Sequence, residues 1–216
     1  MTQKYRNQGL ATHLLTSCVD HLQKSSNIPL LDATPDGRKV YEKIGFRPLF
    51  DIQRLIRDPN PVIIDGRKSN GSIRLKQIAK SDFQAIIQFD KIVTGADRSS
   101  VLVHLRQRQP GFSILARDEK EKLLGYAFGR EGSHAYQIGP VVAVNSEVAI
   151  SLVEFNLRKI RHPVYIDALA SQNALLDWLK KSRFTVQRPF TRMMLGTILE
   201  LGQPELIFAA AGPELG

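Results

Sequence analysis

The chain has 216 residues, of which 43% are hydrophobic, and a formal net charge of +9 at neutral pH. This length and composition are typical of a globular protein with one large or two small domains. The sequence contains no apolar run of the roughly 18 residues that a membrane helix needs, and its first residues are charged and polar where a signal peptide would be apolar. We therefore expect a cytoplasmic protein without a membrane partner.

The distribution of charged and metal-binding residues excludes several other functions. Basic residues are scattered along the chain, and no aromatic-interleaved RNA-binding motif occurs, which argues against a dedicated nucleic-acid-binding protein. The single cysteine, Cys18, cannot form an internal disulfide, and its place among Leu14, Leu15 and Val19 predicts a small buried side chain. The five histidines lie far apart without cysteine partners, so we expect no metal site.

The first predicted element is an amphipathic helix that begins near residue 10 and whose apolar side ends at Leu22. The stretch that opens it has the residue types of an anion-binding loop: Arg6, Asn7, Gln8, Gly9, Leu10 and Ala11. A glycine lets the backbone approach a ligand closely, and the free N–H groups of a helix N-terminus suit a pyrophosphate. Taken alone the pattern is weak, because most glycine-containing helix starts only form turns.

A short strand, a turn and a second helix follow. Residues 29–33 form an apolar run, residues 35–37 predict a turn, and residues 38–46 predict a helix that leads into another strand. The second helix contains Tyr41, four residues before Gly45. The predicted order is therefore helix, strand, helix, strand.

These two motifs, in this order, resemble the GNAT family of acetyl-CoA-dependent N-acetyltransferases. The resemblance implies an α+β fold with a mixed sheet, and acetyl-CoA as the co-substrate. It also implies that the backbone amides of residues 6–11 hold the pyrophosphate of coenzyme A, and that Tyr41 protonates the departing thiolate. A phenol can do this only if it is well positioned and partly desolvated. The alternative is that Tyr41 is a core aromatic residue that packs beside Ile44 and Phe46.

The family places several strands and helices ahead of the pyrophosphate loop, but only five residues precede it here. We therefore interpret residues 1–58 as the C-terminal half of a GNAT domain, shortened at its N-terminus. The resemblance implies that the absent fourth strand would contact the pantetheine arm and often carry the base. A sheet edge left open in this way would favour self-association.

Two clusters of helix-breaking residues predict a linker over residues 59–71, and a second unit then covers residues 72–216. Its hydrophobic pattern predicts a strand, helices, a hairpin, and then further strands alternating with helices. This order repeats the GNAT plan. The second unit, including its closing residues 208–216, resembles the C-terminal domain of tandem acetyltransferases.

Short matching segments indicate an internal duplication. Residues 31–33 parallel residues 166–168, and in both units an arginine follows a phenylalanine by eight residues, at Phe46 and Arg54 and at Phe184 and Arg192.

The second unit differs from the first at both chemical positions. Residues 144–149 carry Glu147, which would repel a pyrophosphate, and Leu179 stands where the first unit has Tyr41. Asp90 and Asp97 fall in the helical region where the family often builds acceptor pockets, and either would suit an ammonium group. Capping or surface pairing is the competing interpretation for both.

The sequence thus predicts direct transfer of an acetyl group from acetyl-CoA to an amine, whose identity as a small molecule or a peptide lysine stays open. The alternative is a non-catalytic GNAT-like module that binds a ligand or a partner.

Overall fold

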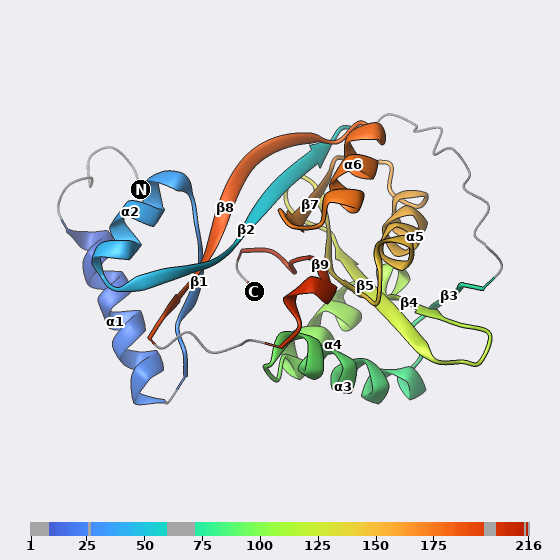
Figure 1. The fold of residues 1–216 in the computed structure, drawn as a ribbon, viewed down its shortest axis with the longest axis horizontal. Helices are drawn as coiled ribbons and strands as arrows, with labels where there is room; N and C mark the ends of the chain where they lie inside the picture. Colours follow the sequence, from blue (N-terminus) through green and yellow to red (C-terminus); the bar gives the residue numbers. More distant parts are fainter. Residues whose placement is uncertain (1–8, 26, 60–71, 197–201, 214, 216) are drawn as a thin grey trace.

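The computed structural model describes residues 9–25, 27–59, 72–196, 202–213 and 215 (Figure 1). Residues 6–8 of the predicted pyrophosphate loop and residues 60–71 of the predicted linker lie outside this range. The first elements are α1 (Leu10–Lys24), β1 (Leu30–Ala33), α2 (Pro35–Lys43) and β2 (Phe46–Arg57).

The remaining elements begin after the linker. They are β3 (Arg74–Gln77), α3 (Phe83–Thr94), α4 (Ser99–Arg108), β4 (Ile114–Arg117), β5 (Leu123–Arg130), β6 (Tyr136–Ala143), α5 (Ser146–Leu157), β7 (Val164–Leu169), α6 (Asn173–Lys181), β8 (Thr185–Leu195) and β9 (Ile207–Ala209).

All the strands of the described residues join one nine-stranded sheet in the order β1-β8-β2-β7-β9-β6-β5-β4-β3. Most neighbouring strands are antiparallel, but β6 and β7 also pair in parallel over three residues each. The predicted α+β fold with a mixed sheet is therefore confirmed.

Helices cover both faces of the part of the sheet that runs from β7 to β3 (Figure 1). One face packs against α5 and α6 in the larger hydrophobic core, which includes Ile138, Leu152 and Leu175. The opposite face packs against α3 and α4 around Tyr126 and Phe128. Fully buried residues on both faces explain why these strands have nearly continuous apolar sequences.

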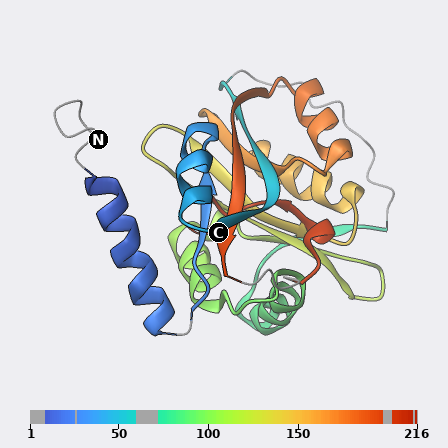
Figure 2. The same ribbon diagram turned by 60° about the vertical axis from the view of Figure 1, so that its left-hand side comes forward.

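Helix α1 lies beside α2, at the opposite end of the molecule from β3 (Figures 1 and 2). Only a narrow strip of it, at Leu15 and Val19, joins the small core formed with β1 and α2. Leu14 is 66% exposed, and Cys18 is exposed as well. The predicted burial of Cys18 is therefore wrong, because the apolar side of α1 is covered only along one strip.

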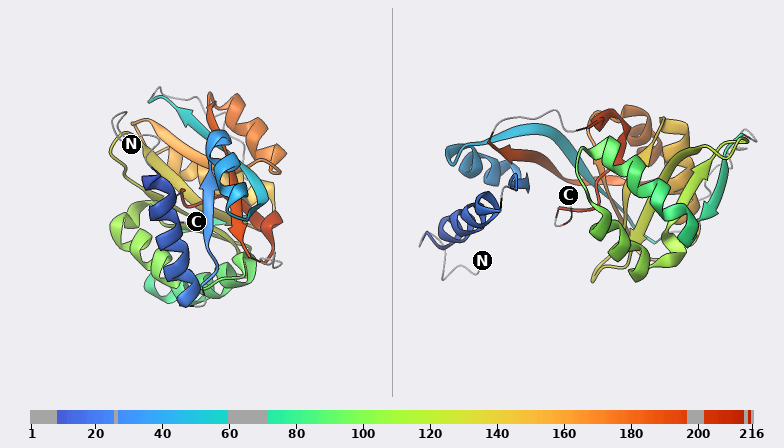
Figure 3. Two further views of the ribbon diagram at one scale, coloured as in Figure 1. Left: turned by 90° about the vertical axis from the view of Figure 1, so that its left-hand side faces the viewer. Right: turned by 90° about the horizontal axis from the view of Figure 1, so that it is seen from below.

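The arrangement of β1, β8, β2 and β7 interleaves the two ends of the chain. Strand β2 lies between β8 and β7, although the elements before and after it in the sequence are α2 and β3. Strand β8 lies in turn between β1 and β2. The two long strands run side by side as a bridge from α2 to the rest of the sheet (Figure 3).

The pairing of β2 with β8 is symmetric about the pair Ile52–Phe190. On one side Asp51 faces Thr191, and on the other Gln53 faces Pro189. The ladder also has two irregularities in register at matching positions on either side of this pair, one between Pro48 and Phe50 and the other between Arg54 and Leu55. The pattern of residue pairs from Ile52–Phe190 toward one end of the ladder is therefore the same as the pattern toward the other end, with β2 and β8 exchanged.

Candidate functional site

The start of α1 has the backbone geometry that the predicted anion site requires. Gly9 is the N-cap residue and adopts a left-handed conformation with φ of 72°, which glycine reaches without steric cost. The helical hydrogen bonds begin with the His13 amide, which donates to the Gly9 carbonyl at 3.0 Å. The amides of residues 10–12 therefore lie ahead of the first helical bond, where they are available to a ligand.

The charge around this helix start favours an anion. The first turn of α1 contains no acidic residue. His13 also lies next to Gly9, since a Cβ atom placed on Gly9 would be 3.7 Å from His13 Cδ2. His13 was not among the residues predicted for this site, although its spacing of four residues from the N-cap glycine places it over the helix start.

The corresponding helix start in the second half of the chain has different properties. The side chain of Asn145 accepts a hydrogen bond from the Val148 amide at 3.0 Å, so one of the helix-start donors of α5 is already used. Glu147 adds a negative charge in the first turn. The residues at the start of α1 therefore fit a pyrophosphate, whereas those at the start of α5 do not.

Tyr41 lies on α2, which starts at a well-formed N-cap. Thr34 Oγ1 accepts a hydrogen bond from the Gly37 amide at 3.2 Å, and Pro35 occupies the first turn. The Tyr41 ring is half-buried, and its centroid is 6.0 Å from that of Phe46. Gly37 leaves room for the ring, because a Cβ atom there would lie 3.1 Å from Tyr41 Cε2.

The structure brings Tyr41 into one cluster with Leu15 and Val19 of α1. Leu15 and Val19 lie about two to three helical turns along α1 from Gly9, because one turn takes 3.6 residues. The contact with Phe46 is the packing that the alternative interpretation of Tyr41 expects. A proton-donor role for Tyr41 stays a prediction.

Two buried ion pairs connect the segments that the sequence analysis identified as duplicated. Arg54 on β2 donates two hydrogen bonds to Asp167 on β7, both of 2.7 Å. Arg192 on β8 donates two to Asp32 on β1, both of 2.8 Å. Each arginine therefore binds the aspartate of the other unit. Gln137 also donates to Asp167, at 3.1 Å.

The two aspartates proposed as ammonium partners already have other roles. Asp97 is exposed and accepts a hydrogen bond from the Ser99 amide at 3.0 Å, so its carboxylate binds the backbone at the start of α4. Asp90 is buried and binds Arg98 through both carboxylate oxygens, at 2.6 and 3.2 Å. The hydroxyl of Tyr126 also donates to Asp90. The structure therefore does not support either residue as an open site for an ammonium group.

This cluster changes the acid–base properties of its members. Burial, reinforced by the neighbouring charge of Asp90, raises the pKa of Tyr126 well above its ordinary value. Burial lowers the pKa of Arg98, but the hydrogen bonds and charge of Asp90 outweigh it, so the net shift is upward. Tyr126 is therefore a neutral donor and Arg98 a cation at physiological pH.

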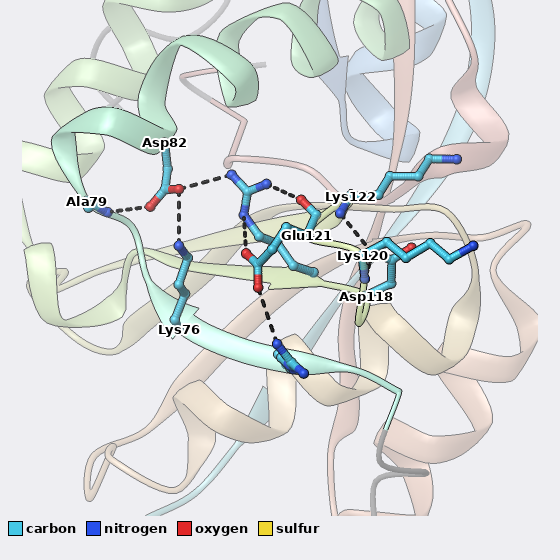
Figure 4. A network of polar contacts seen from close by, with 9 residues as sticks. Lys76, Ala79, Asp82, Asp118, Lys120, Glu121 and Lys122 are labelled. Atoms are coloured by element: carbon cyan, nitrogen blue, oxygen red, sulfur yellow. Dashed lines mark hydrogen bonds and ion pairs between the residues drawn. The ribbon is translucent and has the colours of Figure 1, made fainter.

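A network of polar contacts near β3 lies far from α1 and has a structural role (Figures 1 and 4). Asp82 accepts hydrogen bonds from the Ala79 amide and from Arg117, both at 3.0 Å, and pairs with Lys76 at 3.3 Å. Burial opposes the charged form of Asp82, but these contacts lower its pKa overall. The network fixes the chain where it enters α3 and is not a candidate site.

Within the described ranges, no group of three histidine, cysteine, aspartate or glutamate side chains could hold a metal ion. In the same part of the chain, none of the helices combines the length and the apolar character needed to cross a membrane.

The large mixed sheet, with helices on both faces and an exposed helix start that suits an anion, defines the chain as an α+β protein with a candidate anion site at α1. A model of the acetyltransferase (GNAT) domain matches residues 86–208, which is more than half of the chain. The protein therefore belongs to the GNAT acetyltransferase family, whose members use acetyl-CoA.

Solved structures share the fold of the chain, and one relative is similar in sequence over part of its length. The chain is 24% identical over 185 residues to the uncharacterized N-acetyltransferase YitH of Bacillus subtilis (strain 168), and the match covers 84% of this chain but only 62% of YitH. A putative acetyltransferase from Pyrococcus horikoshii has a TM-score of 0.75 at 19% identity, over 99% of this chain and 68% of its own. A tandem GNAT protein from the clavulanic acid biosynthesis pathway has a TM-score of 0.56 at 11% identity, over 91% and 73% of the two chains.

Proposed function

We propose that the protein is an acetyl-CoA-dependent N-acetyltransferase that transfers an acetyl group directly to an amine. The observation that supports this most is the start of α1, where Gly9 adopts a left-handed conformation and the first turn has no acidic residue. Membership of the GNAT family gives the reaction class. The amine acceptor is a small molecule or a peptide.

In the proposed reaction the backbone amides of residues 6–11 bind the pyrophosphate of acetyl-CoA, as helix N-termini bind anions. The neutral amine, having given a proton to a base or to water, attacks the thioester carbonyl. A C–N bond forms, the attacking nitrogen loses its second proton to water, the C–S bond breaks, and the leaving thiolate takes a proton from the Tyr41 hydroxyl. Tyr41 thus acts as the general acid, and water later restores its proton.

We also propose a tandem arrangement in which residues 1–58 and 72–216 are two GNAT units joined by residues 59–71. The symmetric pairing of β2 with β8 supports this, and so do the crosswise pairs Arg54–Asp167 and Arg192–Asp32. The two units are not separate bodies, because each places its long strand beside that of the other.

The symmetry also indicates what the first unit needs for activity. In the second unit β6 pairs in parallel with the start of β7. The strand of the first unit that corresponds to β7 is β1, and β1 lies at the edge of the sheet. We propose that a strand equivalent to β6 completes the site beside β1. The same open edge favours self-association when no such strand is present.

The test is amine-dependent release of the coenzyme A thiol from acetyl-CoA, measured on the chain and on a version extended by the upstream coding sequence. Thiol release that depends on an amine supports acetyltransferase activity. Thiol release by the extended version alone supports the proposal that a further strand beside β1 completes the site. Amine-independent hydrolysis, or no release by either version, contradicts the proposal. The latter result would favour a non-catalytic binding module, which the open edge of β1 also suits.

A further inference from the structure

The C-terminal segment, residues 207–211, fills an opening in the second unit. Strands β6 and β7 pair in parallel from Tyr136 opposite Val164 to Ile138 opposite Ile166. Beyond these residues β9 lies between them and pairs with both. Ala209 faces Val141 on one side and Ala168 on the other. The two strands therefore separate, and an extended piece of the chain, β9, lies between them.

The fit of this segment is close. Ala209 and Ala211 are completely buried, and the Ala210 amide donates to the Asp167 carbonyl at 2.9 Å. The Ala210 carbonyl oxygen lies only 2.0 Å from the position that a Cβ atom on residue 139 would take, so a glycine is needed there.

Contacts at both ends hold the segment in place. The buried guanidinium of Arg130 donates to the Ala211 carbonyl at 2.9 Å. At the other end Gln172 donates to the carbonyls of Glu205 and Ile207, at 2.8 and 3.0 Å. Phe208 joins the core beneath α5, whereas Ile207 packs toward α3 and α4, as expected for alternate residues of a strand.

The chemistry of the opening defines what else it would accept. Two diverging strand edges offer main-chain N–H and C=O groups to an extended chain that carries amides. A peptide strand meets this requirement, and so does the pantetheine arm of acetyl-CoA, which is an extended chain with amide groups. The segment therefore takes the place of such a ligand.

We infer that residues 207–211 close the second unit to acetyl-CoA by occupying this opening, so that the chain has a single coenzyme site, at α1. This inference rests on the proposed function for the identity of the coenzyme. Glu147 at the start of α5 acts in the same direction, because it disfavours the pyrophosphate.

The experiment combines hydrogen exchange of the full chain with binding of two probes, acetyl-CoA and S-acetylpantetheine, which lacks the nucleotide. In the wild-type protein the amides of residues 207–211 exchange slowly, and neither probe changes their rate. Arg130→Met removes the bond to Ala211. It should raise that rate at least tenfold and strengthen S-acetylpantetheine binding at least tenfold. Arg108→Met is the control, because exposed Arg108 makes the same kind of bond, to the Glu131 carbonyl at 2.8 Å.

Three results would overturn the inference. They are two equivalents of acetyl-CoA on the wild-type chain, faster exchange of residues 207–211 when either probe binds, and a loosened segment without any gain in S-acetylpantetheine binding. If Arg130→Met does not fold, Gln172→Leu at the rim of the segment replaces it. Failure of the wild-type chain to bind acetyl-CoA contradicts the proposed function instead, and the S-acetylpantetheine comparison still decides this inference.

Discussion

The crosswise ion pairs predict a large and specific loss of stability. Arg54→Met removes the guanidinium from Asp167, whose side chain is only 2% exposed. Breaking a buried pair in this way costs about 3–5 kcal/mol, because the remaining charge stays buried without its partner. Asp167 keeps the hydrogen bond from Gln137. We therefore expect a decrease of about 3 kcal/mol in the free energy of unfolding, at the lower end of that range.

The assay is equilibrium unfolding in urea, followed by the fluorescence of Trp178, the single tryptophan. The double variant Arg54→Met/Asp167→Asn is the matched control, and it should lose less than Arg54→Met because no buried charge is left and the amide oxygen still accepts the hydrogen bond from Gln137. Arg192→Met removes both hydrogen bonds that Arg192 donates to Asp32 at the symmetric position, and it should lose at least as much stability as Arg54→Met, because the bond from Gln137 supports Asp167 alone. Because β2 and β8 share one ladder, each variant should unfold in a single transition.

A loss below about 1 kcal/mol for Arg54→Met, or a double variant as unstable as the single one, would refute the reasoning from buried charge. Two separate transitions, of which Arg54→Met shifts only one, would refute the cooperative interleaving of the two halves.

Three further predictions concern single side chains. Tyr41→Phe keeps the ring against Phe46, so it should reduce thiol release at least tenfold while leaving stability unchanged; full turnover would exclude the acid role. Because burial raises the pKa of Tyr126, this residue should stay neutral near pH 10, where a free tyrosine ionises, so the absorbance change of the wild-type protein there should equal that of Tyr126→Phe. Its contribution to stability is present below about pH 10 and is lost as the pH rises further; a larger absorbance change in the wild-type protein near pH 10 would contradict this. The lowered pKa of Asp82 stabilises the fold above about pH 4 and less as the pH falls, so Asp82→Asn should flatten the acid side of the stability curve, and an unchanged curve would contradict it.

Much of the local structure follows from the sequence. The hydrophobic periodicity predicts the order of strands and helices from β3 to α6, because these elements are buried on regular faces. The match between the segments around Asp32 and Asp167 could also be read from the sequence. Together with the repeated spacing from phenylalanine to arginine, this match located both aspartates and both arginines of the buried ion pairs.

The partners of these residues could not be predicted in the same way. The pattern of β2 is the same whether it pairs within its own unit or beside β7, since both positions offer a similar strand edge. Only the pairing in space shows that Arg54 binds Asp167 and not Asp32. The position of β9 between β6 and β7 depends equally on long-range pairing.

The candidate site shows the same limit. The sequence located Gly9 at the start of a helix, and the structure gives it the left-handed conformation that suits this position. Amphipathicity, however, does not specify what covers an apolar face, and for this reason Cys18 is exposed and not buried. Asp90 looked free in the sequence because Arg98 and Tyr126 meet it only in the folded protein.

The measurement that tests the central claim most directly is calorimetric titration of acetyl-CoA into the wild-type chain and into Gly9→Asp and Gly9→Asn. Both replacements have the same shape and tolerate a left-handed backbone, but only aspartate adds a negative charge at the helix start. We expect binding by the wild-type chain that Gly9→Asn largely keeps and Gly9→Asp loses by at least tenfold. Equal binding by the two variants, or no binding by the wild-type chain, would contradict a coenzyme site at the start of α1.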